Sequence, residues 1–311
     1  MAGPGSLGVG PGPATLQMVA PAKLTLSLRV GERRPDGLHG LRSEMVSLSL
    51  ADELVIDPSG DRLTVEQPAG RPDGAVPEGS DNLVVRALAA TGRSAGVRLV
   101  KRIPVGGGLG GGSSDAAAVL RWAGRREPAL ALALGSDVPF CVVGGRAMVS
   151  GVGEDVTPLP FVPRDFVLLV PPFGMDTGAV YRAYDEGAGP GSRRALPEWM
   201  AAPPDGRPGT AGRGPGLGPN ELAGAALRVD GRLGRWGRLL AEVTGRPVML
   251  AGSGSTWFVE GEAARLGVRA PRALGPAGDH GDHGTLLAVR TVPAGWSGDD
   301  PPGPGQDRLR R

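Results

Sequence analysis

Hydrophobic and polar residues alternate with period two in several stretches of the chain, and we expect these stretches to form strands. The first covers residues 17–30, where the alternation begins after Lys23. Period two places every second side chain on the same face of a sheet. Residues 166–170 are continuously apolar, which is typical of a strand buried on both faces. Further strands are predicted at residues 45–50, 53–57, 62–66, 97–103, 146–150, 248–251, 256–259 and 285–292.

Helices are predicted between these strands, and Thr177 is a candidate N-cap for one of them. The predicted helices cover residues 82–90, 114–122, 128–134, 177–185, 221–227 and 233–243. Strands and helices mix without a steady strand–helix–strand rhythm. The fold class is therefore α+β rather than a doubly wound parallel sheet.

Glycine and proline divide the chain into organised and irregular parts. The chain has 311 residues, 40% of them hydrophobic, which is enough for two domains with real cores. The 54 glycines and 31 prolines concentrate near both ends and at 186–219. We expect a first domain over 17–160 and a second over 161–292, with 186–219 as a flexible loop. Residues 1–16 and 293–311 are predicted to be disordered tails.

Charge, cysteine and histidine content exclude several classes of function. The net charge is +2 and the basic residues are scattered, so nucleic-acid binding is not expected. The lone Cys141 lies in an apolar run and is predicted to pack in a core, which rules out an intramolecular disulfide. His280 and His283 are read as part of a solvated loop, and no metal site is predicted. No membrane span or signal peptide is seen, so a cytoplasmic location is expected.

Residues 103–118 hold the strongest chemical signal in the sequence. Six glycines occupy the seven positions 106–112, and an alanine-rich helix follows, predicted to begin at about Ser113 or Ser114. Glycine adopts positive φ freely and lets other groups approach the backbone. Such a loop, together with a helix N-terminus, can direct several N–H groups at an anion. We therefore predict a phosphate cradle whose serine pair caps the helix and reaches the phosphate or its metal ion.

Three other interpretations fit the loop and its flanks less well. A flexible linker is disfavoured because an apolar strand and a helix frame the glycines. Gly106, Gly108 and Gly111 fit a dinucleotide fingerprint, but that fingerprint needs an acidic residue about twenty positions on, after a strand. Glu127 and Asp137 follow no obvious strand. A Walker-type loop is excluded because no Gly-Lys-Ser/Thr follows the glycines.

Three separated segments resemble the GHMP small-molecule kinases. They are the glycine loop with its flanks, residues 20–26 and the glycine-rich residues 251–256. The resemblance implies an N-terminal domain like domain 2 of ribosomal protein S5, a ferredoxin-like C-terminal domain, and ATP with Mg²⁺ as cofactors. The residues that match the ATP cradle are Pro104, Gly106, Gly107, Gly108, Leu109, Gly110, Gly111, Gly112, Ser113 and Ser114.

Residues 33–39, 134–140 and 151–155 are similar to one branch of this superfamily, the 4-diphosphocytidyl-2-C-methyl-D-erythritol kinases of the non-mevalonate route to isoprenoid precursors. The resemblance covers roughly residues 17–292. It implies transfer of the γ-phosphoryl group of ATP to the 2-hydroxyl of a small cytidine-diphosphate-linked substrate, by a monomer or weak homodimer. Another GHMP kinase activity, or a degenerate ATP-binding protein without activity, are the alternatives.

The resemblance assigns catalytic or binding roles to four residues that local sequence alone would interpret as ordinary structural or surface residues. Asp137 could be a turn residue or helix cap, and Lys23 a solvent-facing lysine. By resemblance, Asp137 is the general base and Lys23 pairs with it. His39, otherwise a surface histidine, would read the cytosine. Tyr181, otherwise a buried helix aromatic, would stack on the cytosine.

Several positions depart from the pattern of this branch. Leu38 stands where tyrosine is frequent beside the pyrimidine, and Thr25 stands where asparagine is usual. Both are kept as substrate-binding residues. The interval 120–134 is short, and 186–219 replaces the usual connection. Because the glycine loop, Lys23 and Asp137 are untouched, these changes bear on substrate affinity and folding more than on the reaction class.

Overall fold

The computed structural model describes residues 15–67, 76–187, 200, 218–275 and 283–298. The predictions for residues 1–14, for most of 186–219, for 299–311 and for His280 lie outside the described part. Leu16 is described and begins the first strand, so the predicted N-terminal tail is one residue too long. Residues 293–298, which were predicted to belong to the C-terminal disordered tail, are described and contain a turn at 294–295 and a bend at 298.

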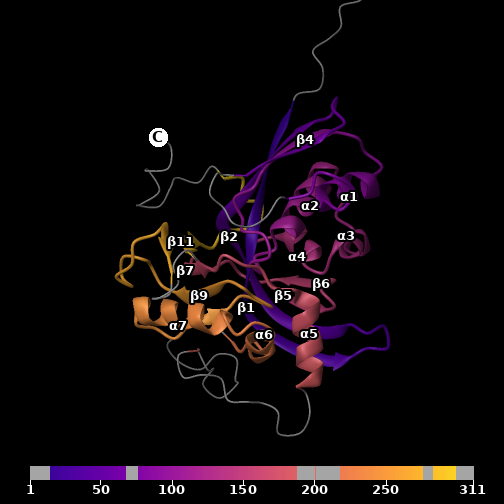
Figure 1. Cartoon of the computed structure of the whole chain (residues 1–311). Coiled ribbons are helices and arrows are strands. Elements are labelled where there is room, and N and C mark those ends of the chain that lie inside the picture. Colours follow the sequence, from indigo (N-terminus) through magenta and orange to yellow (C-terminus); the bar gives the residue numbers. More distant parts are fainter. Residues whose placement is uncertain (1–14, 68–75, 188–199, 201–217, 276–282, 299–311) are drawn as a thin grey trace, which may run out of the picture.

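The first half of the chain forms a six-stranded sheet with four helices. The strand order is β3-β4-β2-β5-β6, with β1 paired to β2. The strands are β1 (Leu16–Arg33), β2 (His39–Asp57), β3 (Leu63–Glu66), β4 (Gly96–Val100), β5 (Arg146–Gly151) and β6 (Asp155–Pro158). The helices are α1 (Leu83–Thr91), α2 (Gly111–Trp122), α3 (Pro128–Leu134) and α4 (Val138–Val143). They lie together beside the sheet, in the magenta part of Figure 1.

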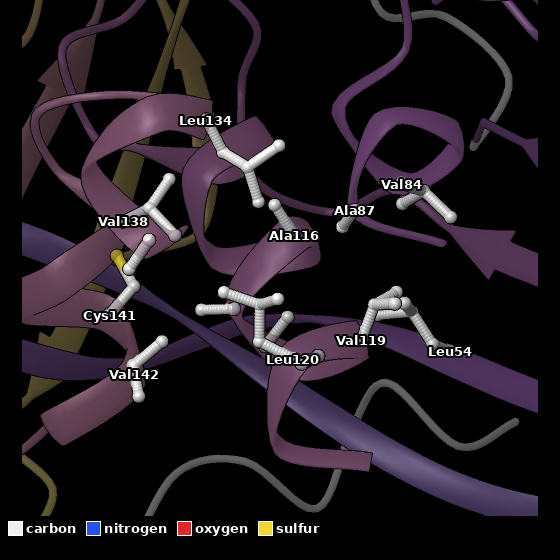
Figure 2. Close-up of a cluster of buried hydrophobic side chains, with 14 of the residues drawn as sticks. Leu54, Val84, Ala87, Ala116, Val119, Leu120, Leu134, Val138, Cys141 and Val142 are labelled. Carbon is white, nitrogen blue, oxygen red and sulfur yellow. The ribbon is translucent and has the colours of Figure 1, made fainter. Parts of the chain in front are cut away.

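Small side chains on α2 let it pack closely in the core between these helices and the sheet. Ala116, Val119 and Leu120 are fully buried. In Figure 2 they lie among Leu54 of β2, Val84 and Ala87 of α1, and the side chains of α4. Cys141 belongs to this cluster, which confirms its predicted place in a core.

The second half forms a five-stranded antiparallel sheet of order β10-β11-β7-β9-β8. Its strands are β7 (Asp165–Val170), β8 (Met249–Leu250), β9 (Trp257–Glu260), β10 (Arg272–Leu274) and β11 (Gly284–Arg290). Its helices are α5 (Thr177–Glu186), α6 (Ala223–Val229) and α7 (Leu233–Thr244). Trp236 of α7 and Trp257 of β9 are buried in the core of this half.

A third hydrophobic cluster joins the two sheets. Leu24 and Leu26 of β1 pack there with Phe166 of β7 and Phe258 of β9. The rings of Phe166 and Phe258 meet edge to face with centroids 5.8 Å apart. Because β1 contributes to this cluster and to the first sheet, its residues lie where the two halves meet. The α+β class is confirmed.

Some predicted element ends are wrong. Residues 45–50 and 53–57 belong to one strand, β2, because the intervening Asp52 continues the pairing with β1. The strand predicted at 97–103 ends at Val100. Thr177 is the first helical residue of α5 rather than its cap, because Asp176 takes that place and accepts the N–H of Ala179 at 3.1 Å.

Three elements, α4, β6 and β10, were not predicted. Helix α4 is six residues long, and Pro139 lies in its first turn, where proline needs no N–H partner. The apolar pattern 138–143 has no helical period that would distinguish it from a buried strand. Strands β6 and β10 have four and three residues, too few to show an alternation.

Candidate active site

The glycine loop is held in a defined shape by contacts from both halves of the molecule. Gly106, Gly108 and Gly110 have φ angles of 70°, 77° and 69°, in the left-handed region that favours glycine. The carbonyl of Leu109 accepts the N–H of Lys23 at 2.9 Å. The carbonyls of Gly106 and Gly107 accept the N–H groups of Met175 and Thr256, both at 3.2 Å. The loop is therefore an ordered cradle and not a linker.

Helix α2 begins at Gly111, earlier than predicted, and no side chain caps it. The N-cap Gly110 lies in the left-handed region, which the predicted serine caps would rarely adopt. Ser114 lies inside the first turn, is fully buried, and donates to the carbonyl of Pro21 at 2.7 Å. The predicted cap is wrong, and the uncapped first turn leaves its N–H groups for an anion.

A cavity of about 450 Å³ lies over the loop. Lys23, Thr25, Asp137 and Tyr181 line it together with Pro104 and residues 106–113. Residues 76–77 and 81–83, before and at the start of α1, also line it. The structure thus brings most of the predicted ATP and substrate residues to one space. Ser114, His39 and Leu38 are not among the residues that line it.

Lys23 and Asp137 converge beside the loop. The Nζ atom of Lys23 lies 3.4 Å from Oδ2 of Asp137 and 3.3 Å from Oγ1 of Thr25. The Lys23 side chain is only 7% exposed, so it is not a solvent-facing lysine. Asp137 precedes α4 but makes no capping hydrogen bond. Asp137 therefore lies beside Lys23 even though the interval 120–134 is short.

His39 lies behind Tyr181 rather than in the cavity. Its Nδ1 is 2.9 Å from the carbonyl of Gly31, and its Nε2 is 2.8 Å from Oδ1 of Asp185. The imidazole stacks on Tyr181 with centroids 5.7 Å apart and planes 22° apart. Burial raises the pKa of Tyr181 to about 12, with Asp137 and Tyr184 adding to the rise. Leu38, beside His39 in sequence, is 54% exposed.

A buried charge cluster at the base of the loop was missed by sequence reasoning. Lys101 Nζ lies 2.7 Å from Asp115 Oδ2 and also contacts Asp52 Oδ2. Asp52 Oδ1 accepts the N–H of Ile103 at 2.8 Å and that of Arg102. Burial raises the pKa of Asp115 to about 8, with Lys101 opposing the rise and Asp52 adding to it.

This cluster fastens β2 to both ends of the glycine loop. The only sequence signals were an aspartate in a predicted helix and a lysine near the end of a predicted strand. Asp52 lies 49 residues before Lys101 and falls between two predicted strands. No local pattern could have joined them.

The donor set suits a magnesium ion only if the phosphates supply most of its ligands. Within the described ranges, no three or more His, Cys, Asp or Glu residues are grouped so that they could hold a metal. Ser113 and Asp137 are among the oxygen-bearing side chains that line the cavity, as are Asp81, Asp115 and Ser136. Mg²⁺ commonly keeps few protein ligands beside substrate phosphates, so Ser113 and Asp137 fit that arrangement.

In the described residues, no helix is long and apolar enough to cross a membrane.

The two-sheet fold and the glycine loop are those of the GHMP class of small-molecule kinases, as comparison with known proteins shows. Residues 82–145 match the model for the GHMP kinases N terminal domain. A 4-diphosphocytidyl-2-C-methyl-D-erythritol kinase of Anaeromyxobacter sp. is 38% identical over 279 residues, 83% of this chain and 86% of the relative. The kinase of that name from Thermus thermophilus is 38% identical, over 84% of this chain and 94% of its own.

A solved structure agrees with these relatives. The crystal structure of a 4-(cytidine 5'-diphospho)-2C-methyl-D-erythritol kinase superposes with a TM-score of 0.59 at 37% identity, covering 88% of this chain and 99% of that one. The chain belongs to the 4-diphosphocytidyl-2-C-methyl-D-erythritol kinase family.

Proposed function

We propose that this protein transfers the γ-phosphoryl group of ATP to the 2-hydroxyl of 4-diphosphocytidyl-2-C-methyl-D-erythritol, with Lys23 and Asp137 as catalytic residues. One observation carries the assignment of the pair. Their side chains are 3.4 Å apart at the edge of the loop, where a Cβ on Gly110 would lie 2.7 Å from Cγ of Lys23. A phosphate in the cradle and a hydroxyl beside Asp137 would therefore be neighbours.

The two residues have complementary tasks. Asp137 accepts the proton of the substrate hydroxyl. At the same time the hydroxyl oxygen bonds to the γ-phosphorus of ATP, and the bond between the γ-phosphorus and the oxygen that bridges it to the β-phosphorus breaks, which releases ADP. Such a base contributes about 10²–10⁴ in rate. The Lys23 ammonium favours the ionised carboxylate and stabilises the negative charge on the transferred group. The hydroxyl of Thr25 accepts a hydrogen bond from Lys23 and so keeps the ammonium in place.

The nucleotide half of the site is made of the loop and the α2 N-terminus. Backbone N–H groups of 106–113 bind the phosphates, and Pro104 shapes the entry to the loop. Ser114 acts through its bond to Pro21, which fastens α2 to β1. Mg²⁺, arriving with ATP, would neutralise the phosphate charge, held on the protein side by Ser113 and Asp137.

The cytidine half of the site lies toward α5. Tyr181 lines the cavity and offers an aromatic face on which cytosine can stack. His39 as a cytosine-reading residue stays a prediction. Both its ring nitrogens lie near protein acceptors, so its side chain would act on the base through Tyr181. Leu38, exposed at the same hairpin, would pack on the base without a π-system. A cytoplasmic monomer or weak homodimer also stays a prediction.

The proposal is tested with Asp137→Asn and Lys23→Met. Asp137→Asn keeps the shape of the side chain and removes the base, so we expect kcat to fall about 10²–10⁴-fold. ATP affinity, measured by calorimetry, should fall only slightly, because the phosphates supply most of the ligands of Mg²⁺ and the loop binds the phosphates. Lys23→Met should lower kcat as well. An Asp137→Asn protein with parental kcat would refute the role of Asp137.

A substrate panel tests the acceptor. The cytidine-linked methylerythritol, homoserine and phosphomevalonate are offered with ATP, and ADP release is measured. Turnover of the first alone supports the proposal. Turnover of another acceptor without the first would assign a different GHMP activity, and ATP binding without any turnover would indicate a degenerate ATP-binding protein.

A further inference from the structure

The outer edge of β1 is covered by the glycine loop and α2 at three alternate residues. The carbonyl of Val19 accepts a bond from the Arg121 side chain at 2.8 Å. The carbonyl of Pro21 accepts the Ser114 hydroxyl, and the N–H of Lys23 donates to the loop. Helix α2 is thereby fastened along the part of β1 that leads to Lys23.

Arg121 also binds a second element. Its Nη1 donates to the carbonyl of Cys141 at 2.6 Å while its Nη2 holds Val19. Cys141 follows Asp137 by one helical turn of α4, and Val19 precedes Lys23 by four residues of β1. One guanidinium therefore joins the helix that carries the proposed base to the strand that carries its lysine.

The position of α4 depends on such contacts. A helix of six residues is far too short to be stable by itself. The carbonyl of Cys141 belongs to its last turn, where the negative end of the helix dipole favours a cation. A planar fork can hold two carbonyls in fixed directions, whereas a lysine ammonium binds as a single point. In the described part of the chain, the hydrogen-bond partners of the Arg121 guanidinium are two neutral carbonyls, so its contacts serve geometry rather than charge pairing.

We propose that Arg121 is a positioning residue that keeps Asp137 within reach of Lys23 by clamping α4 to β1. The inference rests on the proposed function, because it assigns a purpose to the separation of the catalytic pair. Arg121 touches neither ATP nor substrate, since it is not among the residues that line the cavity.

The test compares Arg121→Met, Arg121→Lys and a control, Arg93→Met. The Arg93 guanidinium lies 5.3 Å from the ring centroid of Trp122 on α2, but no bond from its side chain reaches β1 or α4 in the described contacts. We expect Arg121→Met to lower kcat about 10- to 100-fold, as misplacement of a base by about 1 Å does. The KM for ATP should change less than threefold, and Arg93→Met should keep parental kcat.

Two further measurements distinguish positioning of Asp137 by Arg121 from a general contribution of Arg121 to folding. Rates are divided by the concentration of ATP-binding sites, which removes any unfolded fraction. In the Asp137→Asn background, where there is no base to position, Arg121→Met should reduce the remaining kcat less than twofold. If Arg121→Met does not fold, Arg121→Lys decides, with an expected loss of at least fivefold because it can bind only one carbonyl well.

Three results would overturn the inference. They are a parental kcat in Arg121→Met or Arg121→Lys, a loss confined to the KM for ATP, and an equal loss with and without Asp137. A parent protein that does not turn over the cytidine substrate would instead refute the proposed function, so the two failures are distinguishable.

Discussion

Replacing Gly108 by alanine tests whether contact between the loop and the second sheet shapes the cradle. Gly108 has a φ of 77°, and a Cβ there would lie 2.5 Å from the carbonyl oxygen of Ala251 and 2.7 Å from that of Gly254. Both obstacles are backbone atoms, which cannot rotate away. Gly92 provides a matched control because its φ is 66° and a Cβ there meets nothing within 4 Å.

The two variants share one cost and differ in another. Left-handed backbone costs an alanine about 1–2 kcal/mol, so Gly92→Ala should lower the free energy of unfolding by that amount. Gly108→Ala adds overpacking, typically about 1–3 kcal/mol, for a total of about 2–5 kcal/mol. The added methyl also displaces the turn 251–254. Because that turn lies beside Lys23, we expect the KM for ATP to rise about 10- to 100-fold in Gly108→Ala and to stay unchanged in Gly92→Ala.

Urea unfolding measures the first quantity and steady-state kinetics at saturating acceptor the second. Equal destabilisation in the two variants, together with an unchanged KM for ATP in Gly108→Ala, would refute the reasoning. That result would mean that the loop can leave the turn at 251–254 without losing its shape.

Two further predictions follow from buried titratable groups. Because burial raises the pKa of Asp115 to about 8, the folded protein keeps this proton between about pH 4 and 8 while the unfolded chain has lost it. The free energy of unfolding should therefore fall as pH rises through this window, by at most about 1.4 kcal/mol per pH unit from this group. Urea titrations at pH 5, 6.5 and 8 should give a shallower fall for Asp115→Asn, and identical slopes would contradict the assignment. Burial raises the pKa of Cys141 to about 12, with Asp137 adding to the rise, so the native protein should not react with a thiol reagent at pH 8. Labelling should appear only in denaturant, and rapid labelling of the native protein would show that α4 opens.

Much of the fold could be predicted because many helices and strands have a recognisable pattern of hydrophobic residues in their own sequence. Strand β7 is a continuous apolar run and β1 alternates, so both were found close to their observed ends. Helix α4 was not, because it has only six residues and is stabilised by its neighbours rather than by its own pattern. The start of α2 was misplaced since glycines are poor helix formers, yet 111 and 112 are helical here.

The candidate site divides in the same way. Lys23, Asp137 and the glycines lie in recognisable segments, and the structure brings them together. The side-chain roles of His39 and Ser114 could not be predicted, because each depends on a partner distant in sequence. Ser114 donates to a carbonyl 93 positions away, and His39, on strand β2, contacts Asp185 on helix α5. Local sequence defines which groups are available, whereas tertiary packing decides which way they face.

The shape of the phosphate cradle is itself a tertiary property. Three carbonyls of the loop are held by N–H groups, one from β1 and two from the second half of the chain, at Met175 and Thr256. Six glycines in seven positions make many conformations accessible, and no sequence pattern selects one of them. These contacts, together with the Lys101 cluster at the base of the loop, make that selection. The glycines allow the loop to take this shape, and contacts with both sheets select it, which is why the loop and the Lys23–Asp137 pair lie where the two sheets meet.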